Sequence, residues 1–194
     1  MDFYKILSIV FIIAIIVQRA WEMFLKKPPH KNGEIYYGWT LIILIITYNI
    51  VILCAIAEIF FVERTVKLDI RITGLSLLII AFIIRNWSIA TLGNFHSTNI
   101  EIKEGHSLIR RGPYKYLRHP YYLSVMIEVA SIPLTVQSIY TFYLVFIIYI
   151  PCVLMRVYLE EQVLQRTFGE EYEDYKSKVR AFIPLRPLKE ERCS

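Results

Sequence analysis

The chain has 194 residues, of which 56% are hydrophobic and 14% aromatic, and its mean hydropathy is +0.45. A soluble domain of this length cannot bury so much apolar surface, so the composition excludes an ordinary soluble protein and favours a polytopic membrane protein. The net charge of +5 comes from basic residues between the apolar runs, which argues against a nucleic-acid partner. The three cysteines, Cys54, Cys152 and Cys193, are far apart and odd in number, so they predict neither a disulfide framework nor a metal site.

Three apolar segments, roughly 3–25, 38–61 and 68–91, are each long enough to span a bilayer, which takes about 20 residues. The first segment predicts a retained helix and not a cleaved signal peptide. Gln18 and Arg19 follow its long apolar run, where a cleavage site would require small residues.

The apolar stretch from 120 to about 160 is too short for two full spans with a loop, and two prolines interrupt it. We expect a short helix from Pro120 to about Leu134, a turn near 133–138, and a returning helix. The returning helix should continue past its apolar part through RVYLEEQVLQRTFG. The tail, EEYEDYKSKVRAFIPLRP, is helical in pattern and should stop at Pro184.

These elements predict an all-α polytopic membrane protein with about five transmembrane helices, the last two forming a helical hairpin. We expect a single domain, 1–194, with three N-terminal helices in 1–91 and a catalytic half in 92–194. Lys and Arg are dense in 26–37, in 92–119 and after residue 161. The positive-inside rule therefore predicts that the 92–119 loop and the C-terminal tail meet on the cytoplasmic side, of the cell membrane if the source is prokaryotic.

Residues 118–122, RHPYY, join the charged loop to an apolar helix. A residue before proline is pushed out of the helical region, while proline suits the first helical position. Pro120 should therefore open the helix, with Arg118 and His119 beside an N-terminus whose free N–H groups attract an anion. The same two residues could instead be interface anchors of an ordinary helix start, because proline-led helix starts near charge are common.

Arg156 and Glu160 are four residues apart and hence neighbours on one helix face. They could form an ion pair at the surface that contributes little to stability. Arg156, however, directly follows FIIYIPCVLM, near membrane depth, where a charge usually faces a cavity or a partner. Glu161 and Arg166 are expected on the solvated face. Three further charges lie within spans and are interpreted as packing pairs: Glu58, Arg85 and Glu128.

The order EGHSLIRRGPYKYLRHPYY, an apolar hairpin, and RVYLEEQVLQRTFGEEYEDYKSKVRAFIP resembles the isoprenylcysteine carboxyl methyltransferase family. Members are integral membrane enzymes that use S-adenosylmethionine. The resemblance covers about residues 94–184 and rests on GPY, RHPxY, Arg-x-x-x-Glu-Glu and FGxxYxxY in this order. The earlier apolar segments resemble the family only in hydropathy. The extra amino-terminal helices of eukaryotic members have no counterpart in this sequence, so we expect a compact prokaryotic member.

The resemblance implies methyl transfer from S-adenosylmethionine to the C-terminal α-carboxylate of a prenylated cysteine, giving a methyl ester. The prenylcysteine, or another lipid-like carboxylate, would enter from the bilayer. Arg156 corresponds to the substrate position and would be the catalytic residue. Arg118 is predicted to bind the cofactor because its charge lies at the start of the helix. The other predicted cofactor-binding residues follow from the resemblance: Asn99, His106, Ser107, Leu108, Ile109, Tyr114, His119, Pro120, Tyr121, Tyr122 and Glu160.

The chemistry of this reaction requires neither a general base nor a metal, because the sulfonium already activates the methyl group and an α-carboxylate, with a pKa of about 3.5, is ionised at neutral pH. Catalysis is then mainly positioning, for which a guanidinium can clamp the carboxylate through two hydrogen bonds. Three alternatives remain open. They are a phosphatidylethanolamine-type lipid N-methyltransferase, which needs a base, a sterol-reductase-like enzyme that uses NADPH, and a non-catalytic membrane protein.

Overall fold

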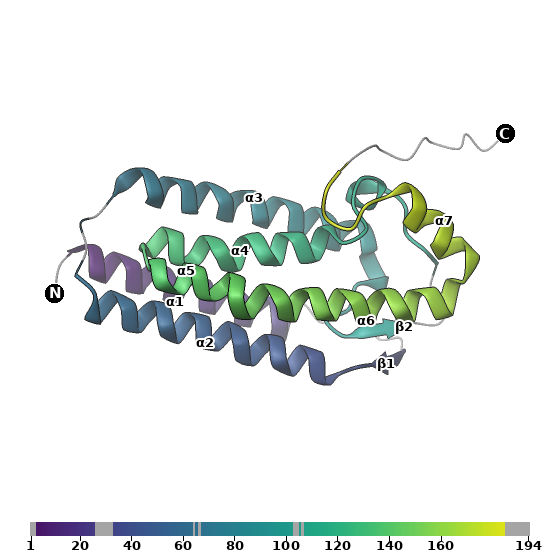
Figure 1. Cartoon of the computed structure of the whole chain (residues 1–194), viewed down its shortest axis with the longest axis horizontal. Coiled ribbons are helices and arrows are strands. Elements are labelled where there is room, and N and C mark those ends of the chain that lie inside the picture. Colours follow the sequence, from purple (N-terminus) through teal and green to yellow (C-terminus); the bar gives the residue numbers. More distant parts are fainter. Residues whose placement is uncertain are drawn as a thin grey trace.

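Long helices run side by side along one axis, and a short helix and a small sheet lie at one end of the bundle (Figure 1). The helices are α1 (Phe3–Leu25), α2 (Trp39–Phe61), α3 (Leu68–Leu92), α4 (Pro120–Val136), α5 (Ile139–Leu144), α6 (Ile150–Phe168) and α7 (Glu170–Lys178). The computed structural model describes residues 3–25, 33–63, 65, 67–102, 105 and 107–184, and describes the side chains of α1 as far as residue 19.

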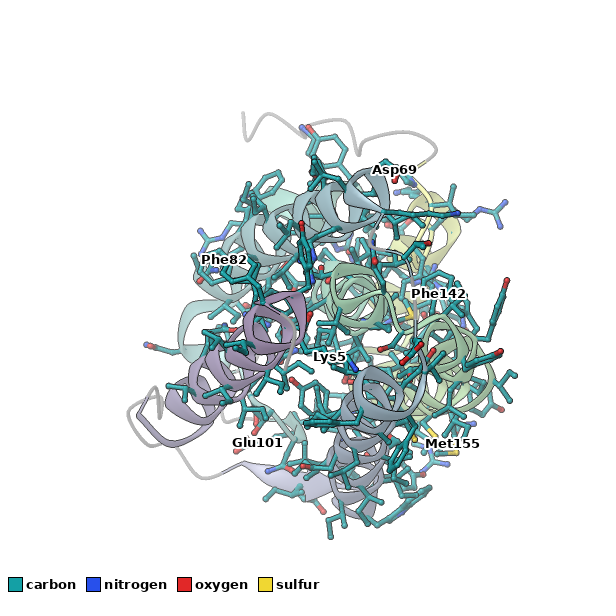
Figure 2. All side chains as sticks on the ribbon, turned by 90° about the vertical axis from the view of Figure 1, so that its left-hand side faces the viewer. Lys5, Asp69, Phe82, Glu101, Phe142 and Met155 are labelled. Carbon is teal, nitrogen blue, oxygen red and sulfur yellow. The ribbon has the colours of Figure 1, made fainter. Side chains whose placement is uncertain are left out.

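The first three predicted apolar helices are present within about a residue of their expected bounds. Among the described residues, three helical stretches are long and apolar enough to cross a membrane, Trp39–Phe61, Leu68–Phe95 and Ile139–Phe168. The bundle also carries large apolar side chains on its outside, such as Phe82 and Met155 (Figure 2). Apolar groups facing outward suit a lipid surrounding, so the chain is an integral membrane protein. The count of five spans stays a prediction.

The predicted hairpin of α4 and α5 forms, but Pro133 lies inside α4, which ends at Val136, about two residues past its predicted end. Pro120 is the first residue of α4, and Gln137 ends the helix in the left-handed conformation, with φ of 61°. The carboxylate of Glu58, from α2, accepts hydrogen bonds from the backbone N–H groups of Tyr140 (3.0 Å) and Thr141 (2.9 Å). Glu58 thereby satisfies N–H groups that have no partner inside the first turn of α5, so it caps that helix from a neighbouring one.

The returning helix is continuous from Ile139 to Phe168, although Pro151 lies within it. A proline inside a helix removes one N–H donor and its ring crowds the carbonyl four residues earlier. A π-helical segment, Val145–Tyr149, ends two residues before the proline and provides a wider turn at this place. Pro151 is therefore accommodated and does not break the span.

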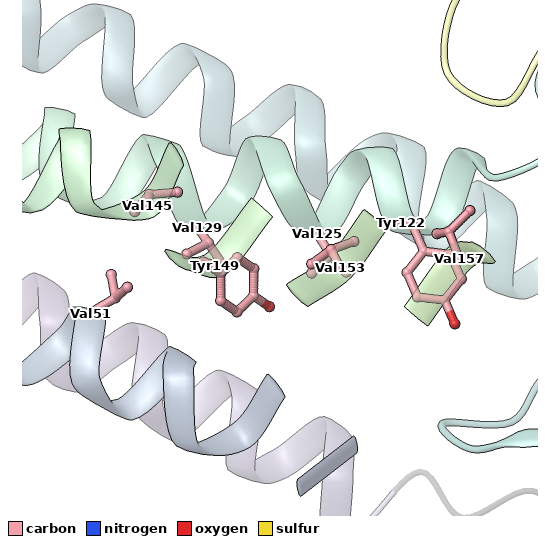
Figure 3. Packing of buried hydrophobic residues seen from close by; sticks show 8 residues of the cluster. All are labelled: Val51, Tyr122, Val125, Val129, Val145, Tyr149, Val153 and Val157. Atoms are coloured by element: carbon pink, nitrogen blue, oxygen red, sulfur yellow. The ribbon is translucent and has the colours of Figure 1, made fainter. Parts of the chain in front are cut away.

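The core between α2, α4 and α6 consists largely of valines (Figure 3). Val51 of α2 belongs to one buried cluster with Val125 and Val129 of α4 and Val153 of the returning helix. Helix α3 approaches α4 closely at Gly74, where an added Cβ would lie 2.6 Å from the backbone nitrogen of Thr135. Small residues allow such close approach between membrane helices, so Gly74 lets α3 pack closely on α4.

Two features of the loop end differ from the sequence-based expectations. A two-stranded antiparallel sheet pairs β1 (Glu34–Tyr36) with β2 (Ile100–Ile102), so the fold is not purely α-helical. Strands of three residues are too short to give a detectable alternation. The tail helix α7 ends at Lys178 and not at Pro184. It ends early because the chain beyond it extends along the start of α4, where its carbonyl groups accept hydrogen bonds from that segment.

Candidate active site

A cavity of about 700 Å³ lies where the helices meet the loop end of the bundle. Helices α1, α2 and α4 and the start of α6 line one part of it. The segment 95–102, the loop before α4, the end of α6 and α7 line the other part. The predicted site residues that line the cavity are Asn99, Leu108, Ile109, Tyr114, Arg118, His119, Tyr121, Tyr122, Arg156 and Glu160.

Two predicted cofactor residues are not brought together with the others. Ser107 is exposed and Pro120 is buried, and neither lines the cavity. His106 lies outside the described residues. The helices α1 and α2 contribute lining residues, such as Ile16 and Leu44, that the sequence analysis did not assign to the site.

Arg156 and Glu160 are joined through the hydroxyl of Tyr122. The hydroxyl donates to Glu160 Oε2 at 2.5 Å and accepts from Arg156 Nε at 3.0 Å. Arg156 also donates from Nη1 to Thr40 Oγ1 (2.7 Å) and from Nη2 to the carbonyl of Thr98 (2.5 Å), and it is 2% exposed. The guanidinium is therefore held in one orientation, and the Tyr122 hydroxyl couples it to the Glu160 carboxylate.

Arg118 and His119 bind the tail of the chain. The Arg118 guanidinium donates from Nη1 to the carbonyl of Val179 at 2.6 Å, and the backbone N–H of His119 donates to Ala181 at 3.1 Å. Both side chains also contact Glu161, which additionally pairs with Lys176 at 3.0 Å. These contacts give Arg118 and His119 protein partners at the place where the sequence analysis expected a bound anion.

The expectation that Glu161 lies on the solvated face is wrong, because its side chain is only 13% exposed. Positions 160 and 161 differ by one residue and therefore point about a quarter of a turn apart on the helix. Glu160 faces the cavity, whereas Glu161 faces the start of α4 and the tail. Arg166 is exposed, as expected.

Helix α7 packs over the loop end of the cavity. Its buried Tyr172 and Tyr175 pack with Val179 and with Leu108 from the loop. The Tyr175 hydroxyl donates to the carbonyl of Tyr114 at 2.6 Å. These contacts hold the tail against the segment that precedes α4, so α7 is part of the cavity wall.

Tyr172 is a site residue that the sequence analysis missed. It lines the cavity and is 1% exposed, and its hydroxyl has no hydrogen-bond partner within the described part of the chain. Burial raises the pKa of this phenol well above its ordinary value, so the hydroxyl keeps its proton. A buried donor of this kind is costly unless a ligand accepts from it. The spacing Tyr172–Tyr175 places both rings on one face of α7 and could have indicated the site.

A buried ionic cluster lies at membrane depth beside the cavity. Glu128 of α4 accepts from Arg85 of α3 and, at 2.7 Å, from Arg19 of α1, with both arginines on Oε2. The interpretation of Arg85 and Glu128 as a packing pair is therefore confirmed. In the described residues, no group of three or more His, Cys, Asp or Glu side chains could hold a metal ion.

The sequence model of the isoprenylcysteine carboxyl methyltransferase (ICMT) family matches residues 73–166. The uncharacterized protein YpbQ of Bacillus subtilis is 32% identical over 157 residues, which are 78% of this chain and 92% of that protein. The chain belongs to the ICMT family. A probable protein-S-isoprenylcysteine O-methyltransferase of Oryza sativa subsp. indica is 32% identical over 117 residues, which are 58% of this chain and 60% of the rice protein. The chain thus spans less than two thirds of this longer relative.

A solved structure of a eukaryotic intramembrane Ras methyltransferase ICMT resembles the fold, with a TM-score of 0.63 at 18% identity. The likeness covers 94% of this chain and 68% of the solved one. The structural likeness therefore extends beyond the segment that the ICMT family model matches and includes the amino-terminal helices. In the sequence analysis, these helices resembled the family only in their hydropathy.

Proposed function

We propose that this ICMT family member transfers a methyl group from S-adenosylmethionine to the C-terminal α-carboxylate of a prenylated cysteine or of a similar lipid carboxylate. The observation that supports this most is one cavity that joins an intramembrane arginine, Arg156, to a carboxylate at its loop end, Glu160, through Tyr122. Such a cavity can place a lipid acid and a water-soluble cofactor next to each other.

The loop end of the cavity suits the cofactor. About 700 Å³ is within the range of small-molecule sites, and Leu108, Ile109 and Tyr114 offer an apolar wall. Glu160 can accept hydrogen bonds from ribose or ammonium groups, and the buried hydroxyl of Tyr172 can donate one. When bound, S-adenosylmethionine supplies a methyl group that its sulfonium has already activated.

Arg156 can orient the acceptor without losing its own supports. Each terminal nitrogen of a guanidinium carries two N–H groups, and Nη1 and Nη2 each use one of them on Thr40 and Thr98. The remaining N–H groups can hold a carboxylate in a fixed direction. The carboxylate is ionised at neutral pH, so the site needs to align the reactants and exclude water rather than remove a proton.

The active site faces the cytoplasm in this proposal, and the protein lies in the cell membrane of a prokaryote. The described residues before α2 (33–38), the described residues between α3 and α4, and helix α7 after α6 lie at the same end of the bundle (Figure 1). In the sequence, these residues belong to the segments in which Lys and Arg are dense. Positive residues gathered at one end favour the cytoplasmic side for that end.

The test uses purified protein, methyl-labelled S-adenosylmethionine and an S-prenylated cysteine analogue. We expect label in the lipid product that mild alkali releases as methanol, because a methyl ester is labile to base. Label that alkali does not release, found on an added aminolipid, would instead identify an N-methyltransferase. The absence of transfer to either acceptor, with S-adenosylhomocysteine still bound, would refute the proposed acceptor class.

A further inference from the structure

A second cavity, of about 460 Å³, lies at the end of the bundle opposite to the candidate active site. The start of α1, the end of α2, the start of α3 and the turn after α4 form its walls. Figure 2 looks onto this end of the bundle and shows Lys5, which lines the cavity, near its middle. No described residue lines both cavities, so this one is separate from the site proposed for methyl transfer.

Two basic side chains line this second cavity, Lys5 of α1 and Arg71 of α3. Arg71 is only 9% exposed, and it donates from Nε to the carbonyl of Thr135 (3.0 Å) and from Nη2 to Ser8 Oγ (2.8 Å). These contacts fix the direction of the guanidinium. Its Nη1 has no hydrogen-bond partner within the described part of the chain, so the N–H groups of Nη1 can bind a ligand.

The cavity keeps a positive charge although it also contains a carboxylate. Glu58 is the one acidic side chain among the described residues that line it. Oε1 of Glu58 accepts from the backbone of Tyr140, and Oε2 accepts from the backbone and the hydroxyl of Thr141. Both oxygens are thus engaged at the start of α5, and neither forms an ion pair with Lys5 or Arg71. The two basic groups are therefore available to an anion.

The two basic groups lie at the level of lipid head groups. Helix α3 has 25 residues, so it is about 37 Å long at a rise of 1.5 Å per residue. The hydrocarbon core of a bilayer is only about 30 Å thick, so the ends of α3 reach the head-group layer. Arg71 is the fourth residue of α3, and Lys5 is the third residue of α1. Both therefore lie where the phosphates of a bilayer are found.

The rim of the cavity is apolar, which favours a lipid over a free anion. Phe3 and Tyr4 line the cavity, and they are 72% and 49% exposed. Ile59 and Val62 of α2 add further apolar surface. A free phosphate gains nothing from such side chains, whereas the acyl chains of a phospholipid can pack against them and continue into the bilayer.

We propose that Lys5 and Arg71 bind the phosphate of an anionic phospholipid in the non-cytoplasmic leaflet. The proposed methyl transfer is not needed for this inference, and only the choice of leaflet rests on the proposed orientation. A lipid with net negative charge, such as phosphatidylglycerol, suits the site. A zwitterionic lipid such as phosphatidylcholine would bring a further positive charge beside two that are already there. The bound phosphate would connect α1 to α3.

The test measures lipid binding to the purified protein by native mass spectrometry, with equal amounts of phosphatidylglycerol and phosphatidylcholine titrated into the detergent. The basic residues at the other end of the bundle also attract anionic lipid. The comparison is therefore between Lys5→Gln and a matched control, Lys67→Gln, because Lys67 is exposed at the same end and does not line the cavity. We expect Lys67→Gln to bind phosphatidylglycerol like wild type. Lys5→Gln should lose one bound phosphatidylglycerol, whose affinity falls about tenfold with one charge-assisted hydrogen bond.

Equal phosphatidylglycerol binding by the two lysine variants overturns the inference. A lipid that depends on Lys5 but shows no preference for phosphatidylglycerol also overturns it, because the charge of the head group would then not matter. Calorimetry with inorganic phosphate distinguishes the two sources of the anion. Phosphate binding that depends on Lys5, without lipid binding that depends on Lys5, would refute a lipid site. Arg71→Gln should weaken lipid binding as Lys5→Gln does, but it also removes contacts between helices, so the Lys5 variant decides.

Discussion

The guanidinium of Arg118 donates two hydrogen bonds to a single carboxylate oxygen of Glu161, from Nε at 3.0 Å and from Nη2 at 2.7 Å. His119 Nε2 lies 3.1 Å from the same oxygen, and Lys176 approaches the other one. Glu161 thus connects α6, the start of α4 and the tail. The RHP sequence therefore closes the C-terminal tail over the cavity through this carboxylate.

Glu161→Gln should loosen the tail without unfolding the helices. An amide keeps the shape of the side chain, but it has only one oxygen to accept with and no charge to attract Arg118 and Lys176. We expect faster proteolysis between residues 169 and 184 and about tenfold weaker binding of S-adenosylhomocysteine. Limited proteolysis and calorimetry measure the two effects.

Glu170→Gln is the matched control, since Glu170 is exposed at the start of α7 and should behave like wild type in both measurements. If Glu161→Gln were as resistant to protease as this control and bound the cofactor product equally well, the carboxylate would not hold the tail.

Tyr172→Phe removes a buried hydroxyl without leaving any described protein group unpaired. If this hydroxyl donates to the cofactor, the affinity for S-adenosylhomocysteine should fall by about tenfold, the value of one hydrogen bond. If it does not, the variant should bind equally well and should be slightly more stable, because an unsatisfied polar group has been removed. Calorimetry compares it with Tyr158→Phe, which alters a tyrosine that is 63% exposed on α6.

The parts of the fold that the sequence predicted are those governed by local rules. Long apolar runs determined the bounds of α2 and α3, and the conformational effect of proline determined where α4 begins. The sheet escaped prediction because β1 and β2 have three residues each and pair across more than sixty residues of chain.

Most of the predicted site residues line one cavity, but their contacts were not predicted. The partners of Arg118 and His119 lie about 40 to 60 residues away, and no spacing rule connects them. The i, i+4 rule placed Arg156 beside Glu160, but the connection runs through Tyr122 on another helix. Tyr172 becomes a site residue only because the loop and tail dock on each other.

Arg156→Lys tests the role of the planar guanidinium. Lysine keeps the charge, but a single nitrogen cannot serve Tyr122, Thr40, Thr98 and a carboxylate in fixed directions. We expect turnover of the prenylcysteine analogue to fall by about 100-fold, as for the loss of one well-placed transition-state contact, with S-adenosylhomocysteine affinity unchanged. Arg166→Lys, exposed on the same helix, should match wild type. Unchanged turnover would show that Arg156 does not orient the acceptor. A loss of S-adenosylhomocysteine affinity equal to the loss of turnover would show that Arg156 binds the cofactor instead.

The sidedness of the bundle can be measured by cysteine labelling. Cys54, Cys152 and Cys193 are first replaced by Ala, and a single cysteine is then introduced at Glu63, between α2 and α3, or at Glu170, at the start of α7; both positions are exposed. If the basic end faces the cytoplasm, a membrane-impermeant maleimide should label Glu63→Cys in intact cells and Glu170→Cys only after the cells are opened. The reverse pattern would place the cavity outside, where S-adenosylmethionine is not supplied, and would contradict both the orientation and the proposed reaction.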